Sequence, residues 1–138
     1  MKKVLPKVKK IITMSIKQAK MYGDNEIRVE HVVISLINDY NNNAIKILNG
    51  VGVDVDNLHK KIELSLLKEK KEEKYSNLKE LPLDDTTENI LKNAEKECDT
   101  LKGDFLDTEH ILLSTLKIKN NVGSILKGMK INYKRCTS

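Results

Sequence analysis

The stretches VEHVVISL (residues 29–36) and TEHILLSTL (residues 108–116) share one pattern, and a shift of 79 positions superimposes them. Each contains a Glu-His pair followed by aliphatic residues and a serine. The correspondence continues on the N-terminal side of both stretches, where apolar positions match in order: Ile11 with Ile90, Ile12 with Leu91, Ala19 with Cys98 and Ile27 with Leu106. A single shared dipeptide would carry no weight, but this many ordered matches predict an internal duplication.

The first copy has the residue spacing of amphipathic helices. Apolar and small residues recur at three- and four-residue intervals between residues 8 and 19, which predicts a helix that starts near Pro6 and stops at Gly23. The same reasoning predicts three further helices in this copy, over residues 29–37, 44–48 and 54–66.

The second copy repeats this arrangement. Asp85 and Glu88 are spaced as a capping box, which predicts that a helix begins at Asp85. Its inner stripe is expected to consist of Ile90, Leu91, Ala94, Cys98 and Leu101. A second helix is expected to begin at Asp107 or Thr108, a short third helix to include residues 125–126, and a final turn to open at Asn132.

These patterns predict an all-α fold of two tandem four-helix repeats. A helical unit of roughly 60 residues is marginal when it stands alone, so two similar units with apolar stripes should pack together around a pseudo-twofold axis. We expect one domain over residues 1–138, with the first repeat at about 6–67, a charged linker at about 68–83 and the second repeat at about 84–136.

Composition narrows the classes of function. The formal net charge is +5, and one Phe, four Tyr and no Trp give poor support for stacking on single-stranded nucleic acid. No apolar run reaches the length of a membrane span, and the basic N-terminus lacks the apolar core of a secretory signal. The two cysteines form no disulfide framework, so a reducing, cytoplasmic location is expected.

Charge is distributed unevenly along the chain. Residues 83–110 carry nine acids and three bases, whereas residues 117–135 carry six bases and no acid. Patches of opposite sign suit protein partners better than a uniform polyanion. The basic stretch is expected to be a solvated surface, with docking of an acidic partner, such as an adaptor or the body of an unfoldase, as the functional alternative.

The doubled Glu-His motif, the first helix of each unit and the Leu-x-Gly endings resemble the Clp N-terminal domain, the double-repeat domain that precedes the ATPase modules of ClpA, ClpB and ClpC unfoldases. The segments that carry the resemblance read MYGDNEIRVEHVVISL (residues 21–36) and TLKGDFLDTEHILLSTL (residues 100–116). The resemblance is greatest to the ClpC type and covers residues 6 to about 134.

This resemblance implies a helical domain that docks adaptor proteins and protein substrates, without ATP hydrolysis of its own. ClpC-type domains also bind phosphorylated arginine, with the Glu of each Thr-Glu-His motif holding the guanidinium, which points to Glu30 and Glu109. Thr108 belongs to the second motif, and Arg28 is interpreted as the residue that replaces the threonine of the first. Both are therefore further candidate residues for binding the ligand or partner. The family uses a threonine at the start of each repeat's first helix to contact phosphate.

At these two threonine positions the chain has Leu5 in the first repeat and Asp84 in the second. An Asp repels an incoming phosphate, so the resemblance predicts a weakened first phosphoarginine site and an impaired second one.

Plainer interpretations stay open for these residues. Glu30 and Glu109 lie in first helical turns, where the helix dipole favours a carboxylate, so capping alone would account for them. Next to apolar runs, His31 and His110 are more typical of packed histidines than of metal ligands. Cys98 fits the core, whereas Cys136 is expected to be exposed.

No catalytic, metal or cofactor site can be defended from spacing. The segment from Gly123 to Gly128 has the glycine spacing of a phosphate-binding loop, but Met129 stands where that loop requires Lys. The leading hypothesis is therefore a non-catalytic recognition domain, alone or attached to the ATPase modules of a Clp unfoldase. The alternative is a nucleic-acid-binding regulator that uses the Lys-rich helices, which the mild net charge supports only weakly.

Overall fold

The computed structural model describes residues 3–68 and 81–137, and within them the fold is helical. The expected linker at 68–83 lies largely outside the described residues. The elements, in chain order, are β1 (Lys3–Val4), α1 (Pro6–Met21), α2 (Val29–Asp39), α3 (Asn43–Gly50), α4 (Val55–Lys68), α5 (Asp85–Thr100), β2 (Phe105–Leu106), α6 (Thr108–Lys117), α7 (Asn121–Gly128) and α8 (Tyr133–Thr137). The predicted order of four helices in each repeat is confirmed.

Side-chain caps define the starts of several helices. Asn42 accepts a hydrogen bond from Ile45 N–H at the start of α3, and Asn120 does the same for Gly123 N–H at the start of α7. These caps stabilise helices of only eight residues, which would be marginal in isolation. In α5 the N-cap is Asp84, which accepts from Thr87 N–H at 2.8 Å, so the expected start of a capping box at Asp85 is wrong by one residue.

Two short backbone pairings join the repeats and were not anticipated. β1 and β2 form a two-stranded parallel sheet in which Val4 pairs with Leu106, and an isolated parallel bridge pairs Leu83 with Ile27. A shift of 79 positions relates Val4 to Leu83 and Ile27 to Leu106. The segment before the first helix of each repeat therefore pairs with the segment before the second helix of the other, as pseudo-twofold symmetry requires.

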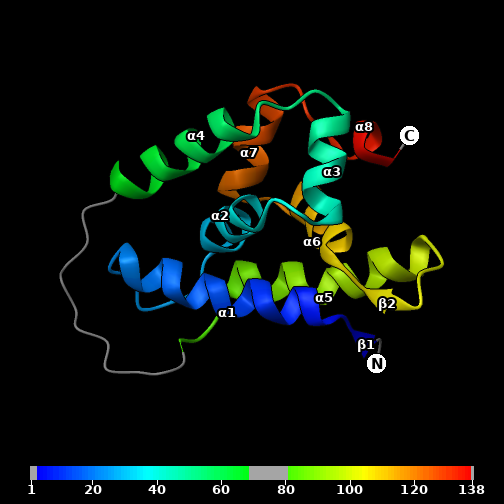
Figure 1. Cartoon of the computed structure of the whole chain (residues 1–138), viewed down its shortest axis with the longest axis horizontal. Helices are drawn as coiled ribbons and strands as arrows, with labels where there is room; N and C mark the ends of the chain where they lie inside the picture. Colours follow the sequence, from blue (N-terminus) through cyan, green and yellow to red (C-terminus); the bar gives the residue numbers. More distant parts are fainter. Residues whose placement is uncertain (1–2, 69–80, 138) are drawn as a thin grey trace.

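Helices α2 and α6 form the centre of the molecule. Figure 1 shows α1 and α5 on one side of them and α3, α4, α7 and α8 on the other. Helix α3 packs on α6 and α7 packs on α2, so each repeat covers the central helix of its partner. Nearly every residue of α2 is buried, which explains why residues 32–37 are apolar on all sides of the helix apart from the small Ser35.

Close contacts of α2 with α1 and of α6 with α5 are made through small polar residues. Ser114 Oγ donates to Ile90 O at 2.6 Å, and Ser15 and Ser35 lie 3.4 Å apart in the other repeat. All of these serines are fully buried, and each hydroxyl donates to a backbone carbonyl. The repeated serine of the two quoted stretches is thus a packing residue, because its small side chain lets the helices approach.

The inner stripe of α5 differs from the expectation at its end. Ile90, Ala94 and Cys98 are buried as predicted, but Leu101 is 47% exposed because the helix ends at Thr100 and Leu101 is its C-cap. Within the described ranges 3–68 and 81–137, no helix is long and apolar enough to cross a membrane.

Candidate functional site

The first copy of the motif places Arg28 and Glu30 against each other at the start of α2. Arg28 Nη2 lies 2.7 Å from Glu30 Oε2, and the two side chains are 21% and 5% exposed. A charge-assisted pair this short and this buried is stronger than an exposed ion pair. The carboxylate that the sequence marks as a ligand contact is therefore already bound to a guanidinium of the same chain.

The second copy holds its carboxylate differently. Glu109 is only partly buried, but its Oε2 atom is buried and accepts no hydrogen bond from any residue in the described part of the chain. Leaving a charged oxygen without a donor away from water is costly, although the position in the first turn of α6 offsets part of that cost through the helix dipole. Glu109 thus offers an acceptor that a partner could satisfy.

Thr108 lies in the interior. Its side chain is completely buried, and Oγ1 accepts a hydrogen bond of 3.1 Å from Ala44 N–H at the start of α3. This contact crosses from one repeat to the other. Thr108 corresponds to Val29, whereas Arg28 corresponds to Asp107, the N-cap of α6. The interpretation of Arg28 as a replacement for the motif's threonine is therefore wrong.

Both motif histidines have structural roles. His31 Nδ1 accepts from Arg28 N–H and His110 Nδ1 accepts from Asp107 N–H, each at 2.9 Å. His31 Nε2 lies 2.7 Å from Asp24 Oδ2, which makes it the donor and fixes the tautomer when the ring is neutral. The packed, hydrogen-bonded interpretation of these histidines is confirmed: each one satisfies a backbone N–H at a helix start.

The cross-repeat strands change which residues flank each motif glutamate. Leu5 N–H donates to Leu106 O at 3.1 Å, and Asp84 N–H donates to Ile27 O at 2.9 Å. Leu5 therefore lies beside the segment that enters α6 and Glu109. Asp84 lies beside the segment that enters α2 and Glu30.

This grouping is the reverse of the one expected from sequence, which kept each pair within its own repeat. The end of α5 lies at the start of α6, where Cys98 Sγ donates to Phe105 O at 3.2 Å. Asp84 stands 14 residues before Cys98, which is roughly 20 Å along a helix. Asp84 is therefore remote from the start of α6 and lies on the Glu30 side of the molecule.

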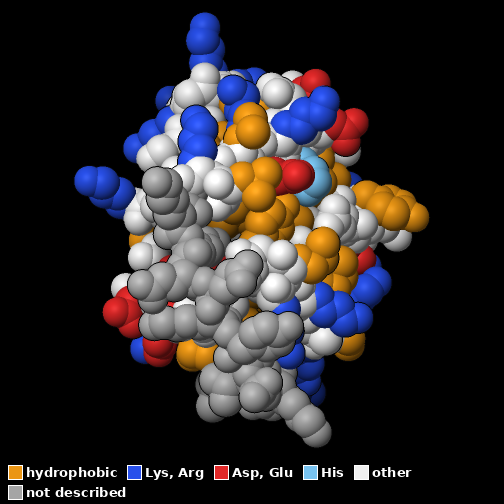
Figure 2. Space-filling view, turned by 90° about the vertical axis from the view of Figure 1, so that its left-hand side faces the viewer, with side chains coloured by type: hydrophobic (Ala, Val, Ile, Leu, Met, Phe, Trp, Pro, Cys, Tyr) orange, Lys and Arg blue, Asp and Glu red, His pale blue; other side chains and the backbone are white. Residues whose placement is uncertain are grey.

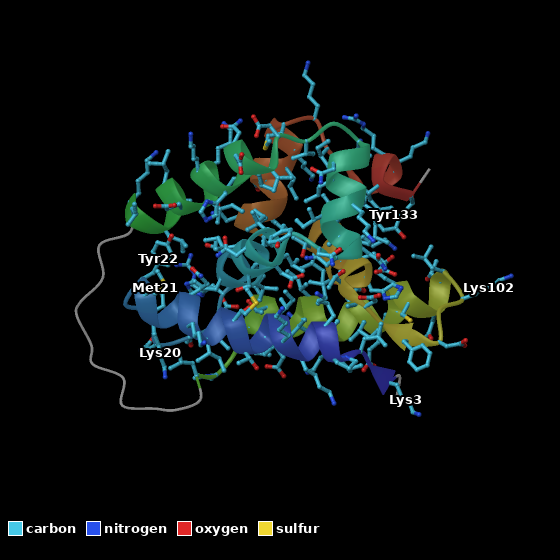
Figure 3. All side chains as sticks on the ribbon, in the orientation of Figure 1. Lys3, Lys20, Met21, Tyr22, Lys102 and Tyr133 are labelled. Carbon is cyan, nitrogen blue, oxygen red and sulfur yellow. The ribbon has the colours of Figure 1, made fainter. Side chains whose placement is uncertain are left out.

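The flanks of the two glutamates also differ in charge. The start of α1, on the Glu109 side, carries the exposed Lys3 and Lys9, whereas its Lys7 and Lys10 bind Asp39 of α2. The start of α5, on the Glu30 side, carries Asp84, Asp85 and Glu88. Figure 3 shows Lys3 projecting outward from β1. Basic groups near a carboxylate suit a ligand that carries both charges, and the flank of Glu109 offers exposed lysines that are not bound to the glutamate itself.

A buried polar cluster that the sequence did not indicate lies at the other end of α5. Glu97 is 1% exposed and binds Lys117 Nζ at 2.9 Å through one oxygen and the Tyr133 hydroxyl at 2.7 Å through the other. Its hydrogen bond raises the pKa of both Lys117 and Tyr133. Two residues of the basic C-terminal stretch, Lys117 and Arg135, are thus bound within the chain, the latter to backbone carbonyls.

The cysteines take no part in a site. Cys98 is completely buried, which confirms its expected place in the core, and its thiol donates to backbone carbonyls. Cys136 is half-buried rather than exposed, and this burial raises the pKa of its thiol, which makes it a weaker nucleophile. Among residues 3–68 and 81–137, no group of three or more His, Cys, Asp or Glu is arranged to hold a metal ion.

Comparison with known proteins identifies the family to which the chain belongs. Residues 3–129 match the Clp repeat (R) N-terminal domain, so the chain belongs to this family. Chaperone protein ClpB 1 of Nostoc sp. is 25% identical over 130 residues, which cover 94% of this chain and 14% of the ClpB protein. The chain thus spans about one seventh of the length of this relative. ClpB of Corynebacterium diphtheriae is 24% identical, with coverage of 92% and 15%.

Solved structures show the same fold. The N-domain of ClpV from Vibrio cholerae superimposes with a TM-score of 0.77 at 19% identity, covering 96% of this chain and 79% of that one. The N-terminal domain of Hsp104 from Candida albicans gives 0.77 at 16% identity, with coverage of 97% and 86%. Likeness at such low identity establishes the double-repeat architecture alone.

Proposed function

We propose that this chain is the protein-recognition domain of a ClpC-like ATP-dependent unfoldase, working in the cytoplasm. In this role it binds adaptor proteins or substrate segments, and ATP hydrolysis belongs to modules outside these 138 residues. Membership of the Clp repeat N-terminal domain family supports the general role. The ClpC-like assignment rests on the sequence resemblance described above.

The observation that carries the proposal is the buried acceptor at Glu109. Its Oε2 atom has no donor among the described residues and stands in the first turn of α6. A guanidinium is the side-chain group best matched to a carboxylate, because it donates two parallel hydrogen bonds and keeps its charge when partly desolvated. The ligand at this position is therefore an arginine side chain of a partner protein.

Phosphorylated arginine fits the surroundings of Glu109 better than free arginine. The start of α1 carries Lys3 and Lys9, both exposed, on the flank of the α6 start. A phosphoryl group on the guanidinium would lie on the side of these basic residues and away from the acids at the start of α5. The same ligand at Glu30 would face Asp84.

Exposed apolar residues favour a protein partner over a nucleic acid. Figure 2 shows hydrophobic side chains gathered on the face formed by the C-terminal ends of α1 and α4, with lysines around them. The large apolar residues exposed at these two helix ends are Met21 (75%), Leu64 (56%) and Leu67 (63%). Such side chains typically mark protein contacts.

The test is binding of an arginine-phosphorylated substrate protein to the wild type and to the Glu30→Ala/Glu109→Ala double variant. Loss of charge-assisted hydrogen bonds worth about 1.5–3 kcal/mol should weaken binding at least about tenfold. Helicity should stay unchanged, because neither carboxylate supplies the cap of its helix. Asp56→Ala is the matched control, since it removes an exposed first-turn carboxylate from α4. Equal affinity of the wild type and the double variant would overturn the role of the glutamates.

A further inference from the structure

We infer that Arg28 is an internal ligand of Glu30, so that the domain accepts a partner's guanidinium at one site, Glu109, instead of at two. The inference rests on the proposed function and adds what regulates it. A duplicated domain would ordinarily offer two equivalent sites. Here one of them is closed by a residue of the chain itself.

Arg28 and Glu30 form a short ion pair at the start of α2. Arg28 and Glu30 are two residues apart on the same helix start, with 2.7 Å between Nη2 and Oε2. The backbone that carries Arg28 is held on both sides: Arg28 N–H donates to His31 Nδ1, and Ile27 pairs with Leu83. Because the backbone is already fixed, only the rotamers of the Arg28 side chain must be ordered when the pair forms, which lowers the entropic cost of the internal contact.

The second copy of the motif differs at the position of Arg28. The residue that corresponds to Arg28 is Asp107, and its carboxylate accepts from Thr108 N–H at 2.7 Å and from Asn43 Nδ2 at 3.1 Å. Asp107 therefore closes the α6 start by capping and supplies no cation. The Arg28–Glu30 pair shows which chemical group this kind of helix-start glutamate takes, and Glu109 is the copy in which that group is lacking.

Arg28 competes with a partner's arginine for Glu30. A group tethered two residues from its partner has an effective concentration on the order of millimolar or higher. A partner's arginine at micromolar concentration must displace Arg28 from Glu30. Its own guanidinium must also lose water to enter the site. The acidic start of α5, with Asp84 beside Ile27, adds repulsion when the arriving arginine carries a phosphate. The competition acts only on the Glu30 side, because Asp107 at the α6 start supplies no guanidinium.

The experiment counts sites by calorimetric titration with a short peptide that contains one arginine, in unmodified and phosphorylated forms. Wild type should bind one equivalent of the phosphorylated peptide, and Glu109→Ala should bind none. Arg28→Thr, which supplies a capping hydroxyl, should gain a second equivalent with at least one of the two peptides. Arg28→Thr/Glu109→Ala should keep that gained site. Lys60→Ala, a change at an exposed residue of α4, should behave as wild type.

Amide chemical shifts locate the sites independently of the count. Peptide should shift the amides of Glu109 and His110 in wild type, and those of Glu30 and His31 as well once Arg28 is removed. Arg28→Lys keeps the charge without the planar fork and should show intermediate behaviour, which guards against a folding defect in Arg28→Thr.

Two equivalents bound by wild type, or no second site in well-folded Arg28→Thr and Arg28→Lys, would overturn the inference while the proposed function survives. Absence of binding by wild type and by every variant would overturn both.

Discussion

The Tyr133 hydroxyl donates a hydrogen bond of 2.7 Å to Glu97 Oε2 and thereby ties the five-residue helix α8 to α5. The other oxygen of Glu97 binds Lys117, whose ammonium also lies 4.5 Å from the centre of the Tyr133 ring. Both oxygens of a carboxylate that is almost completely buried are thus satisfied. A helix too short to be stable alone is held by side chains from two neighbours.

Tyr133→Phe should lower the free energy of unfolding by about 1–3 kcal/mol, because it leaves one oxygen of buried Glu97 without its donor. The ring stays in place, so its packing and its contact with Lys117 are retained. Urea denaturation followed by circular dichroism measures the change. Tyr40→Phe is the matched control, since Tyr40 is 78% exposed and should cost less than about 0.5 kcal/mol. Equal effects of the two substitutions would mean that the Glu97 contact contributes nothing.

The same cluster predicts a dependence on alkaline pH. The hydrogen bond to Glu97 raises the pKa of Tyr133 above its ordinary value of 10.0. A group whose pKa is higher in the folded state contributes its full stability below its unfolded value and loses it as the pH rises through the folded value. The stability difference between wild type and Tyr133→Phe should therefore be constant below about pH 10 and shrink above it. A difference that grows with rising pH would contradict this assignment.

The repeat is the part of the fold that sequence alone could establish. The 79-residue shift fixes the order of helices, and Pro6, Gly23 and Asp54 mark boundaries by known local rules. The pseudo-twofold packing follows because neither half can bury its apolar stripe alone. The two histidines were also predictable as packed residues, since each stands next to a continuous apolar run.

The features that the sequence did not predict depend on contacts between residues that are distant in the sequence. The pairing of Val4 with Leu106 involves strands of two residues, which leave no periodic signal. Without that pairing, Leu5 and Asp84 were grouped with the wrong glutamates. The sequence around Glu97 gives no sign that this charged residue is buried. Its burial is tolerated because Lys117 from α6 and Tyr133 from α8 bind its two oxygens.

Asp39, at the end of α2, predicts a dependence on acid. Burial alone would raise its pKa, but hydrogen bonds from Asn42, Lys10 and Lys7 outweigh burial and lower it below the ordinary value of 3.8. The carboxylate therefore contributes stability above about pH 3.8, and that contribution is lost as the pH falls through the folded value. Asp39→Asn should be less stable than wild type at neutral pH, and the gap should narrow in acid.

Acid titration of unfolding measures this effect. Asp56→Asn serves as the control, because Asp56 is exposed at the start of α4 and should leave the pH profile unchanged. A gap between wild type and Asp39→Asn that stays constant down to about pH 2 would show that the two lysines do not stabilise the charged form.

Substitutions of Thr108 test whether this residue of the second motif stabilises the fold or binds the ligand. Its hydroxyl oxygen is the acceptor for Ala44 N–H, one of the first amides of α3, which have no partner within their own helix. Thr108→Val keeps the shape and matches Val29 of the other repeat, but it leaves that amide without an acceptor. We expect a loss of about 1–3 kcal/mol in the free energy of unfolding, whereas Thr108→Ser, which keeps the acceptor, should lose less.

Because the Thr108 side chain is completely buried, peptide affinity of the folded Thr108→Val protein should stay within about twofold of wild type, a difference of less than about 0.5 kcal/mol. A variant that folds with wild-type stability but no longer binds the peptide would place Thr108 in the binding site instead.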